Sequence, residues 1–377
     1  MDTKKRGIFV MPDLIRDIEV FSPIFRVENP PYDSSFVLKN RGNTVVRVIT
    51  ESGLSGYGMT FADPIGEYIL KGLREEVVGR DPLAFEDIWD AMFTSIRSAG
   101  RKGVALLGMS VIDIAVWDLR GKILKQPVYR LLGGSKRKIP CYASVGFLSM
   151  PIEECLEKSA EYIADGYKTL KIKVGYDGGG NIAADARRVR RLREAVGDDV
   201  DIIVDANGIY DAATAIRFAE AAADCNICLF EEPVHADDIA GLARVRAATK
   251  IPVASGENEY TKYGCRDLVL ANAVDVLQFD ITRAGGFTEM LKITAISQAF
   301  NLKIAPHFWP QFSAHLLSAA SNGLFLEVFP PEKGANPGGM IIKNQPPVTG
   351  GFYELPETPG LGLDFDLQYL EQFREGF

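Results

Sequence analysis

The stretch that decides the fold is residues 169–207, TLKIKVGYDGGGNIAADARRVRRLREAVGDDVDIIVDAN. Apolar and charged residues alternate over 169–174, as is typical of a β-strand. A helical pattern follows at 183–197, and an apolar, β-branched run comes next at 201–205. Strand, helix and strand in this order predict a right-handed βαβ unit in a parallel sheet.

The same texture repeats along the chain from residue 139. Eight apolar segments alternate with helical ones, at 139–147, 169–175, 201–207, 227–233, 251–258, 273–280, 302–308 and 324–329. Eight such units predict a closed (β/α)8 barrel of the TIM type, which is an α/β fold. An open, doubly wound sheet is the structural alternative, but its glycine-rich first turn is missing here.

The regions on either side of the barrel have a different character. Residues 43–59 predict a β-hairpin that turns at Gly53–Gly56. Residues 103–124 predict a helix, with one apolar stripe formed by Ile112, Ala115, Val116 and Leu119. We therefore expect an α+β domain at 1–135, a barrel at 136–335, and a C-terminal segment at 336–377 that packs back on the N-terminal domain.

Composition argues against several classes of protein. The net charge is −8, and the longest basic run is only Ser135–Lys138, so we expect no nucleic-acid partner. No apolar run reaches the roughly 18 residues of a membrane span. We read no signal peptide at the N-terminus, and the five scattered cysteines include a single C-x-x-C, within a strand pattern. We expect a cytoplasmic protein with free thiols.

Ionisable residues stand at the predicted C-terminal ends of nearly all barrel strands, where barrel active sites are built. They are Lys171, Lys173, Asp205, Glu231, Glu257, Asp280, His307 and Glu327. Each residue alone has a plainer explanation, such as a solvated edge strand, a helix start or a packed histidine. The whole set, in register with strands that should otherwise be apolar, makes coincidence a poor explanation.

Three of these residues are carboxylates that lie one βα unit apart. Asp205, Glu231 and Glu257 follow one another at intervals of 26 residues. Neighbouring strands lie about 5 Å apart, so the three carboxylates can converge. Without a counter-charge they would repel one another. Because oxygen ligands favour Mg²⁺ over zinc, we predict one Mg²⁺ per chain at this point.

Lysine and histidine face this predicted cation site. With a period of two, Lys171 and Lys173 both point into the barrel. A neighbouring cation, partial burial and a nearby divalent ion all lower the pKa of an ammonium group, so one lysine can act as a base near neutral pH. Across the mouth, His307 fits a second acid or base, and Asp280 can orient its ring.

Contacts to a substrate are expected from the mouth loops and from the N-terminal domain. His235 follows the fourth strand and could touch the substrate, whereas His315 is expected to pack inside a helix. The further candidates for substrate binding are Arg26, Tyr32, Ser144, Asn207 and Trp309.

In these motifs the sequence resembles the enolase superfamily, specifically its mandelate racemase subgroup, over nearly the whole chain. KIKVG, VDAN, FEEP, GEN and PHFWP resemble the family's lysine, metal-ligand and histidine motifs, in the family's order. SVIDIAVWDLRGKILKQPVYRLLGG resembles its stretch before the barrel, and PETPGLGLDFD its C-terminal return. The resemblance implies a modified (β/α)7β barrel under an N-terminal capping domain, and a homo-oligomer between dimer and octamer.

The resemblance also implies a role for each site residue. Lys173 would be one acid–base, with Lys171 lowering its pKa near the substrate carboxylate. His307, held by Asp280, would be the other. The three carboxylates would bind Mg²⁺, and Glu327 would hydrogen-bond the substrate oxygen that gains charge. Glu232, the second acid of FEEP, is expected to turn away from Glu231.

The implied reaction is abstraction of a proton α to the carboxylate of a small molecule, through an enediolate. Where a related branch has a lysine base, DITRAGG has Arg283, which is a poor base. We expect dehydration of a sugar acid, an aldonate or aldarate, to a 2-keto-3-deoxy acid; the polar loop 26–35 suits a polyol. The alternatives are a racemase, epimerase or lactone cycloisomerase of a hydroxy acid and, more remotely, a non-catalytic barrel.

Overall fold

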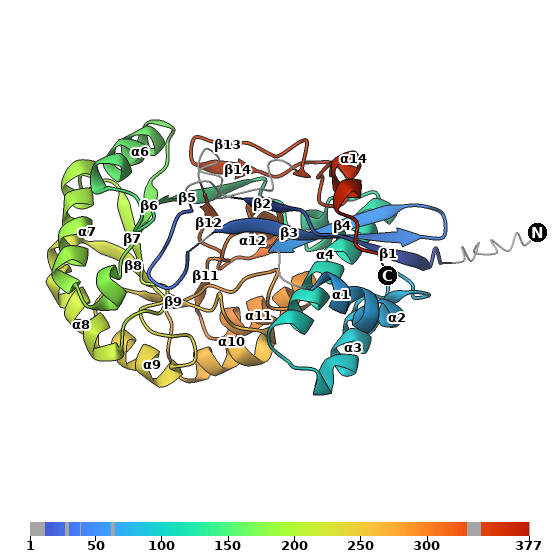
Figure 1. The fold of residues 1–377 in the computed structure, drawn as a ribbon, viewed down its shortest axis with the longest axis horizontal. Coiled ribbons are helices and arrows are strands. Elements are labelled where there is room, and N and C mark those ends of the chain that lie inside the picture. Colours follow the sequence, from blue (N-terminus) through green and yellow to red (C-terminus); the bar gives the residue numbers. More distant parts are fainter. Residues whose placement is uncertain (1–11, 27–29, 38, 62–64, 330–340, 377) are drawn as a thin grey trace, which may run out of the picture.

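A closed barrel of eight parallel strands forms the larger part of the computed structural model (Figure 1). The strands are β5 (Lys138–Gly146), β6 (Thr169–Lys173), β7 (Asp201–Asp205), β8 (Ile227–Glu231), β9 (Val253–Ser255), β10 (Val276–Leu277), β11 (Lys303–Ile304) and β12 (Leu326–Val328). β12 pairs with β5, and the Leu324 N–H donates to the Ile304 carbonyl at 2.9 Å, which closes the ring. The structure describes residues 12–26, 30–37, 39–61, 65–329 and 341–376, without the side chains of residues 26, 40 and 41.

One α-helix lies between each strand and the next, on the outside of the barrel (Figure 1). The helices are α6 (Ile152–Ala164), α7 (Ile182–Val196), α8 (Ala212–Ala221), α9 (Ile239–Ala248), α10 (Thr261–Leu270), α11 (Gly286–Ala299) and α12 (Pro310–Ala319). Along the chain, β12 is followed by β13 (Val348–Thr349). Eight parallel strands that alternate with these helices confirm the predicted TIM-type barrel. None of the helices so described is long and apolar enough to span a membrane.

Apolar side chains fill the barrel beneath its mouth. The layer consists of Tyr142, Ile203, Leu229, Ala254, Val276 and Ala305. Lys171 pairs in register with Ile203, so it is the residue that β6 contributes to this layer. One step further along the strands, Lys173, Asp205 and Glu231 pair in register with one another. The period-two alternation thus places both lysines inside the barrel, as predicted.

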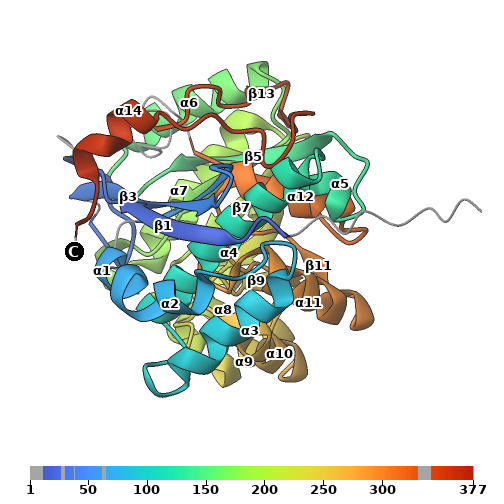
Figure 2. The same cartoon turned by 90° about the vertical axis from the view of Figure 1, so that its right-hand side faces the viewer.

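The N-terminal domain is a four-stranded sheet with helices on one side (Figure 2). Its strands are β1 (Ile15–Phe21), β2 (Ile24–Arg26), β3 (Asn40–Thr50) and β4 (Ser55–Phe61). Its helices are α1 (Gly66–Tyr68), a π-helical turn (Ile69–Leu73), α2 (Arg74–Val77), α3 (Phe85–Ser95), α4 (Val104–Ile123) and α5 (Val128–Leu131). β3 and β4 form the predicted hairpin, with Ile49 opposite Ser55.

Helix α4 joins this domain to the barrel. A single apolar stripe was predicted, but α4 is buried on nearly every side, because the sheet covers one face and α11 another. Gly58 lets the sheet come close: a Cβ added there would lie 2.1 Å from the Val111 carbonyl oxygen. On the barrel side, the Trp117 indole donates to the Thr288 hydroxyl at 2.9 Å.

The C-terminal segment borders the barrel first and the N-terminal domain last. β14 (Phe352–Glu354) pairs with β13 and with the start of β5. After α14 (Leu367–Leu370), the Ser22 N–H donates to the Phe373 carbonyl and the Glu375 N–H to the Val20 carbonyl. The expected boundary at 335/336, and residues 1–11 where a signal peptide was looked for, lie outside the described residues.

His315 on α12 is packed inside the protein, as predicted. Its Nδ1 accepts the Tyr129 N–H of α5 at 3.1 Å, so the proton is on Nε2, which donates to the Leu361 carbonyl at 3.3 Å. Burial lowers the pKa of His315 from 6.5 to about 3. The histidine therefore stays neutral in the folded protein while it takes up a proton in the unfolded chain.

Gly58→Ala should test the close approach of β4 to α4. The added methyl meets backbone rather than a flexible side chain, so we expect a loss of about 1–3 kcal/mol in the free energy of unfolding, measured by urea denaturation. Gly72→Ala is the matched control. Its Cβ would meet only the Tyr68 side chain at 3.4 Å, so this variant should be as stable as the parent or more so. Equal stability of both variants would contradict the packing described.

Acid should destabilise the protein through His315. Because the folded pKa lies below that of the unfolded chain, stability falls as the pH drops below 6.5, by about 2 kcal/mol at pH 5. The measurement is urea unfolding at pH 7 and pH 5 for the wild type and for His315→Gln. The glutamine variant should lose less stability than the wild type between the two pH values, whatever its stability at pH 7. An equal loss in both proteins would count against a buried neutral histidine.

Candidate active site

Two buried lysines and three buried carboxylates form one charged network at the mouth. Lys171 Nζ lies 2.7 Å from Glu231 Oε1, 2.5 Å from Glu327 Oε1 and 3.5 Å from Asp205 Oδ2. Lys173 Nζ forms an ion pair with the same Asp205 oxygen. The two ammonium groups that the sequence places on one face of β6 therefore face acidic groups on β7, β8 and β12.

The charges of the chain itself raise the pKa values of both lysines, whereas the lowered value expected from the sequence presupposes a divalent cation beside them. Burial opposes the charge on Lys171, but the carboxylates of Glu231 and Glu327 outweigh burial and raise its pKa. Burial also opposes the charge on Lys173, and Asp205 raises its pKa more than Lys171 lowers it. Three carboxylates around two ammonium groups leave acidic charge in excess.

The excess of acidic charge affects the pKa values of the carboxylates differently. Burial works against ionisation of Asp205, but Lys173 and Lys171 hold its pKa below the usual range. Burial and the neighbouring Asp205 raise the pKa of Glu231 to about 8. In the described structure, Glu231 Oε2 has no hydrogen-bond partner. A buried acidic oxygen without a donor is a position that a cation would suit.

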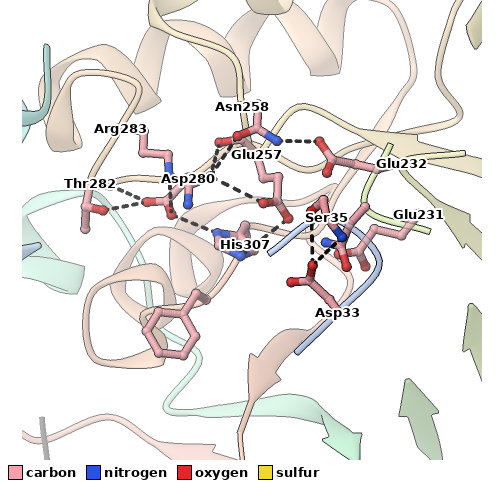
Figure 3. A network of polar contacts seen from close by, with 12 residues as sticks. Asp33, Ser35, Glu231, Glu232, Glu257, Asn258, Asp280, Thr282, Arg283 and His307 are labelled. Carbon is pink, nitrogen blue, oxygen red and sulfur yellow. Dashed lines mark hydrogen bonds and ion pairs between the residues drawn. The ribbon is translucent and has the colours of Figure 1, made fainter. Parts of the chain in front are cut away.

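His307 and Asp280 form the predicted dyad on the other side of the mouth (Figure 3). His307 Nδ1 lies 2.8 Å from Asp280 Oδ2, while Asp280 Oδ1 accepts the N–H and the hydroxyl of Thr282. Burial opposes the charge on His307, but Glu257 and Asp280 raise its pKa. The contact with Asp280 thus orients the imidazole ring, and Nε2 points into the mouth, 3.4 Å from Glu257 Oε2.

Glu327 connects the two halves of the site. Its Oε1 binds Lys171, and its Oε2 lies 3.9 Å from His307 Nε2. The Phe308 N–H also donates to Oε2, at 3.2 Å. In the barrel four strands lie between β6 and β11 in one direction and two in the other, so lysine and histidine approach the mouth from nearly opposite sides.

The side chains of the three predicted metal ligands do not converge on one point in this structure. No three His, Cys, Asp or Glu side chains of the described residues are arranged to hold an ion. Asp205 and Glu231 pair in register, but their carboxylate oxygens form ion pairs with Lys173 and Lys171. Glu257 lies beyond the end of β9 and contacts Arg283 at 3.3 Å. The all-oxygen donor set and the unpartnered Glu231 Oε2 nevertheless fit a hard divalent cation.

Glu232 was expected to turn away from Glu231 through strand alternation, but the backbone does not continue the strand at this residue. Its φ is +40°, which ends the strand alternation immediately after Glu231. The side chain is buried and accepts a hydrogen bond from Asn258 Nδ2 at 2.9 Å (Figure 3). Burial and the nearby Glu257 and Asp205 raise its pKa well above the usual range. A left-handed residue at a strand end leaves no clear signal in a Glu-Glu-Pro motif.

Some of the expected substrate contacts do lie at the mouth. The loop at residues 30–37 touches the barrel, because Ser34 Oγ donates to the Ala206 carbonyl at 2.6 Å and the Leu148 N–H donates to the Tyr32 carbonyl at 3.1 Å. Ser144 is buried and in register with Lys171. The Asn207 N–H donates to Asp205 Oδ1 at 2.8 Å.

Other expected contacts are placed differently. Trp309 is only 1% exposed and packs against Phe61, Phe308 and Phe312, so the structure gives it a packing role. The His235 side chain is 75% exposed in the loop after β8. The Arg26 side chain lies outside the described residues.

Comparison with known proteins agrees with this architecture. Residues 16–133 match the N-terminal domain of the mandelate racemase/muconate lactonizing enzyme family, and residues 154–369 match the enolase C-terminal domain-like family. The chain belongs to this family. The resemblance drawn from its motifs is thereby confirmed, and the N-terminal domain is the family's capping domain.

Curated relatives cover nearly the whole chain. The arabinonate dehydratase of Saccharolobus solfataricus is 29% identical over 96% of this chain and 99% of its own length. The D-galactarolactone cycloisomerase of Agrobacterium fabrum is 31% identical over 93% of this chain and 96% of its own. Among solved structures, L-talarate/galactarate dehydratase from Salmonella typhimurium, liganded with Mg and L-lyxarohydroxamate, is 28% identical with a TM-score of 0.88, covering 100% of this chain and 96% of its own.

Lys171→Met should leave two buried acidic groups without their counter-charge. We expect a loss of about 3–5 kcal/mol in the free energy of unfolding, because breaking a buried ion pair strands the remaining charge. The measurement is urea unfolding at pH 7.5 in the presence of a chelator. The control is Lys71→Met, which removes an exposed partner of Glu67 and should leave the unfolding midpoint unchanged. Identical midpoints for the two variants would contradict the network as described.

Proposed function

We propose that this protein is a Mg²⁺-dependent enzyme that abstracts a proton α to a carboxylate, and that the reaction is dehydration of a sugar acid. One observation carries the proposal: Lys173 and His307 approach the mouth from nearly opposite sides, with acidic oxygens between them. Two acid–base groups that face one another can take a proton from one carbon and deliver a proton to its neighbour. A protein that only bound ligands would not need both groups.

Each residue of the mouth has a definite task in this proposal. Asp205, Glu231 and Glu257 would hold Mg²⁺, which supplies positive charge against the enediolate that forms when the α-proton leaves. Lys171 and Glu327 lie on the same side and would hydrogen-bond the substrate carboxylate. Asp280 keeps the His307 ring in place.

The proton balance of the dehydration is simple. One member of the Lys173–His307 pair, as the neutral base, takes the α-proton, and the C–H electron pair forms the enediolate. The other member, protonated, gives its proton to the β-hydroxyl, whose C–O bond breaks as water leaves. The enol that remains takes up a proton on the β-carbon and loses the proton of its hydroxyl group, which gives the 2-keto-3-deoxy acid. The configuration of the α-carbon decides which residue acts first.

Sugar acids are the favoured substrates because of both the relatives and the mouth. Two relatives are dehydratases of arabinonate and of talarate or galactarate. In this chain, hydroxyl and acidic groups of the capping loop, Asp33, Ser34 and Ser35, lie against the barrel end that holds Asp205 and Asn207. The alternative is an isomerase, since one relative is a lactone cycloisomerase. An isomerase would return the proton without losing water.

We further propose a cytoplasmic homo-oligomer with a capping domain over 1–135, a barrel over 136–335 and a C-terminal segment over 336–377. All five cysteines, each of which is described, are free thiols, as suits a reducing compartment. Light scattering of the purified protein checks the oligomeric state. A monomer would contradict that part of the proposal.

The test is a panel of aldonates and aldarates with the Mg²⁺-loaded protein, followed by a 2-keto-acid assay and by NMR of α-proton exchange in D₂O. We expect a keto acid from at least one member of the panel, loss of activity with a chelator, and recovery on adding Mg²⁺. Lys173→Ala and His307→Ala should each lose about 10²–10⁴-fold in rate.

The outcomes of this panel separate the proposed reactions. Exchange of the α-proton without a keto acid would replace the dehydratase by an isomerase. A panel with neither product nor exchange would contradict the proposed chemistry and favour a barrel without catalytic activity.

A further inference from the structure

Arg283 joins the ends of two barrel strands at the mouth (Figure 3). Its Nη1 donates to the Glu257 carbonyl at 2.9 Å and to Asn258 Oδ1 at 3.2 Å, and lies 3.3 Å from Glu257 Oε1. Its Nε lies 3.7 Å from Asp280 Oδ2. One guanidinium group therefore contacts both the loop after β9 and the loop after β10.

The capping domain supports the same guanidinium group. The Arg283 Cζ lies 5.2 Å from the centre of the Phe61 ring, at the end of β4. The side chain is only 20% exposed. Burial opposes its charge, but Asp280 and Glu257 raise its pKa, so the group stays protonated and cannot move protons. Whatever Arg283 contributes to the mouth must come through position and charge.

Glu257 needs such support more than the other two carboxylates do. Asp205 and Glu231 are the last residues of β7 and β8, so strand register places them. Glu257 comes two residues after the end of β9 and directly after Gly256, whose φ is +132°. No β-ladder holds it there.

The two carboxylate oxygens of Glu257 have different partners. Oε1 lies toward the guanidinium group, while Oε2 lies 3.4 Å from His307 Nε2, inside the mouth. The bond to Asn258 extends this support, because Asn258 Nδ2 in turn binds Glu232. A planar group with several donors can satisfy these acceptors together, whereas a single ammonium group would have to choose among them.

We propose that Arg283 is a positioning residue that turns Glu257 into the mouth for cation binding and ties it to the Asp280–His307 dyad. The inference rests on the proposed function for the identity of the cation. It assigns a purpose to an arginine at the place where a related branch has a catalytic lysine. Arg283 itself would touch neither the substrate nor the cation.

The test is Mg²⁺ binding to the substrate-free protein, measured by isothermal titration calorimetry. Arg283→Met should weaken Mg²⁺ binding about 10–100-fold, as expected when a partner that orients a metal ligand is lost. Arg283→Lys keeps the charge but cannot reach all the acceptors at once, so it should fall between the methionine variant and the wild type. Arg190→Met is the matched control, since Arg190 binds Asp224 and the Ala221 carbonyl on the outer face of the barrel, away from the mouth. This variant should bind Mg²⁺ as the wild type does.

The possible results separate this inference from the proposed function. Wild-type Mg²⁺ affinity in Arg283→Met would overturn the positioning role and leave the proposed function standing. If Arg283→Met does not fold, the lysine variant decides, and wild-type affinity there would overturn the inference as well. Weakened binding in the variants of a protein that turns over no sugar acid would support the inference and contradict the proposed function. A wild type that binds no Mg²⁺ would overturn both.

Discussion

The mouth of the barrel depends on the balance of charge around Lys171. This ammonium group is 1% exposed, sits in a layer that is otherwise apolar, and contacts carboxylates from three different strands. Its Nζ also lies 5.4 Å from the centre of the Tyr142 ring, which belongs to the same layer. A buried charge is tolerated only when it is paired, so the positions of β7, β8 and β12 around β6 are tied to this one side chain.

The same balance explains why the site would select a divalent cation. With two lysines against Asp205, Glu231 and Glu327, one acidic charge is left over, and it appears in the pKa of about 8 for Glu231. Glu257 and Glu232 bring further acidity from the next loops. A pocket of this kind attracts a cation and then the carboxylate of a substrate, while the lysines keep it from collapsing through repulsion.

Regular strands made much of the fold and site predictable. Period-two alternation places Lys171 and Lys173 inside, and the 26-residue spacing puts Asp205 and Glu231 side by side. Prediction fails where the backbone leaves the strand. Glu232 sits at φ +40°, and Trp309 at φ +48°, where it packs among aromatic rings instead of facing a substrate. The stripe expected on α4 failed for another reason: a helix between two layers has no exposed side, and one sequence does not show how many layers surround it.

Arg283 shows how the capping domain takes part in the chemistry without supplying a reactive group. As a substitute for a base it looks inert, because it cannot release a proton. Its role is to connect three parts of the molecule, because it contacts the Phe61 ring of the capping domain and the carboxylates of two barrel loops. Those loops lie beyond the short strands β9 and β10, where few ladder hydrogen bonds define the backbone. A permanently charged, planar side chain supported by the cap can supply the order that the strands do not, and this makes the cap part of the mouth rather than only a cover over it.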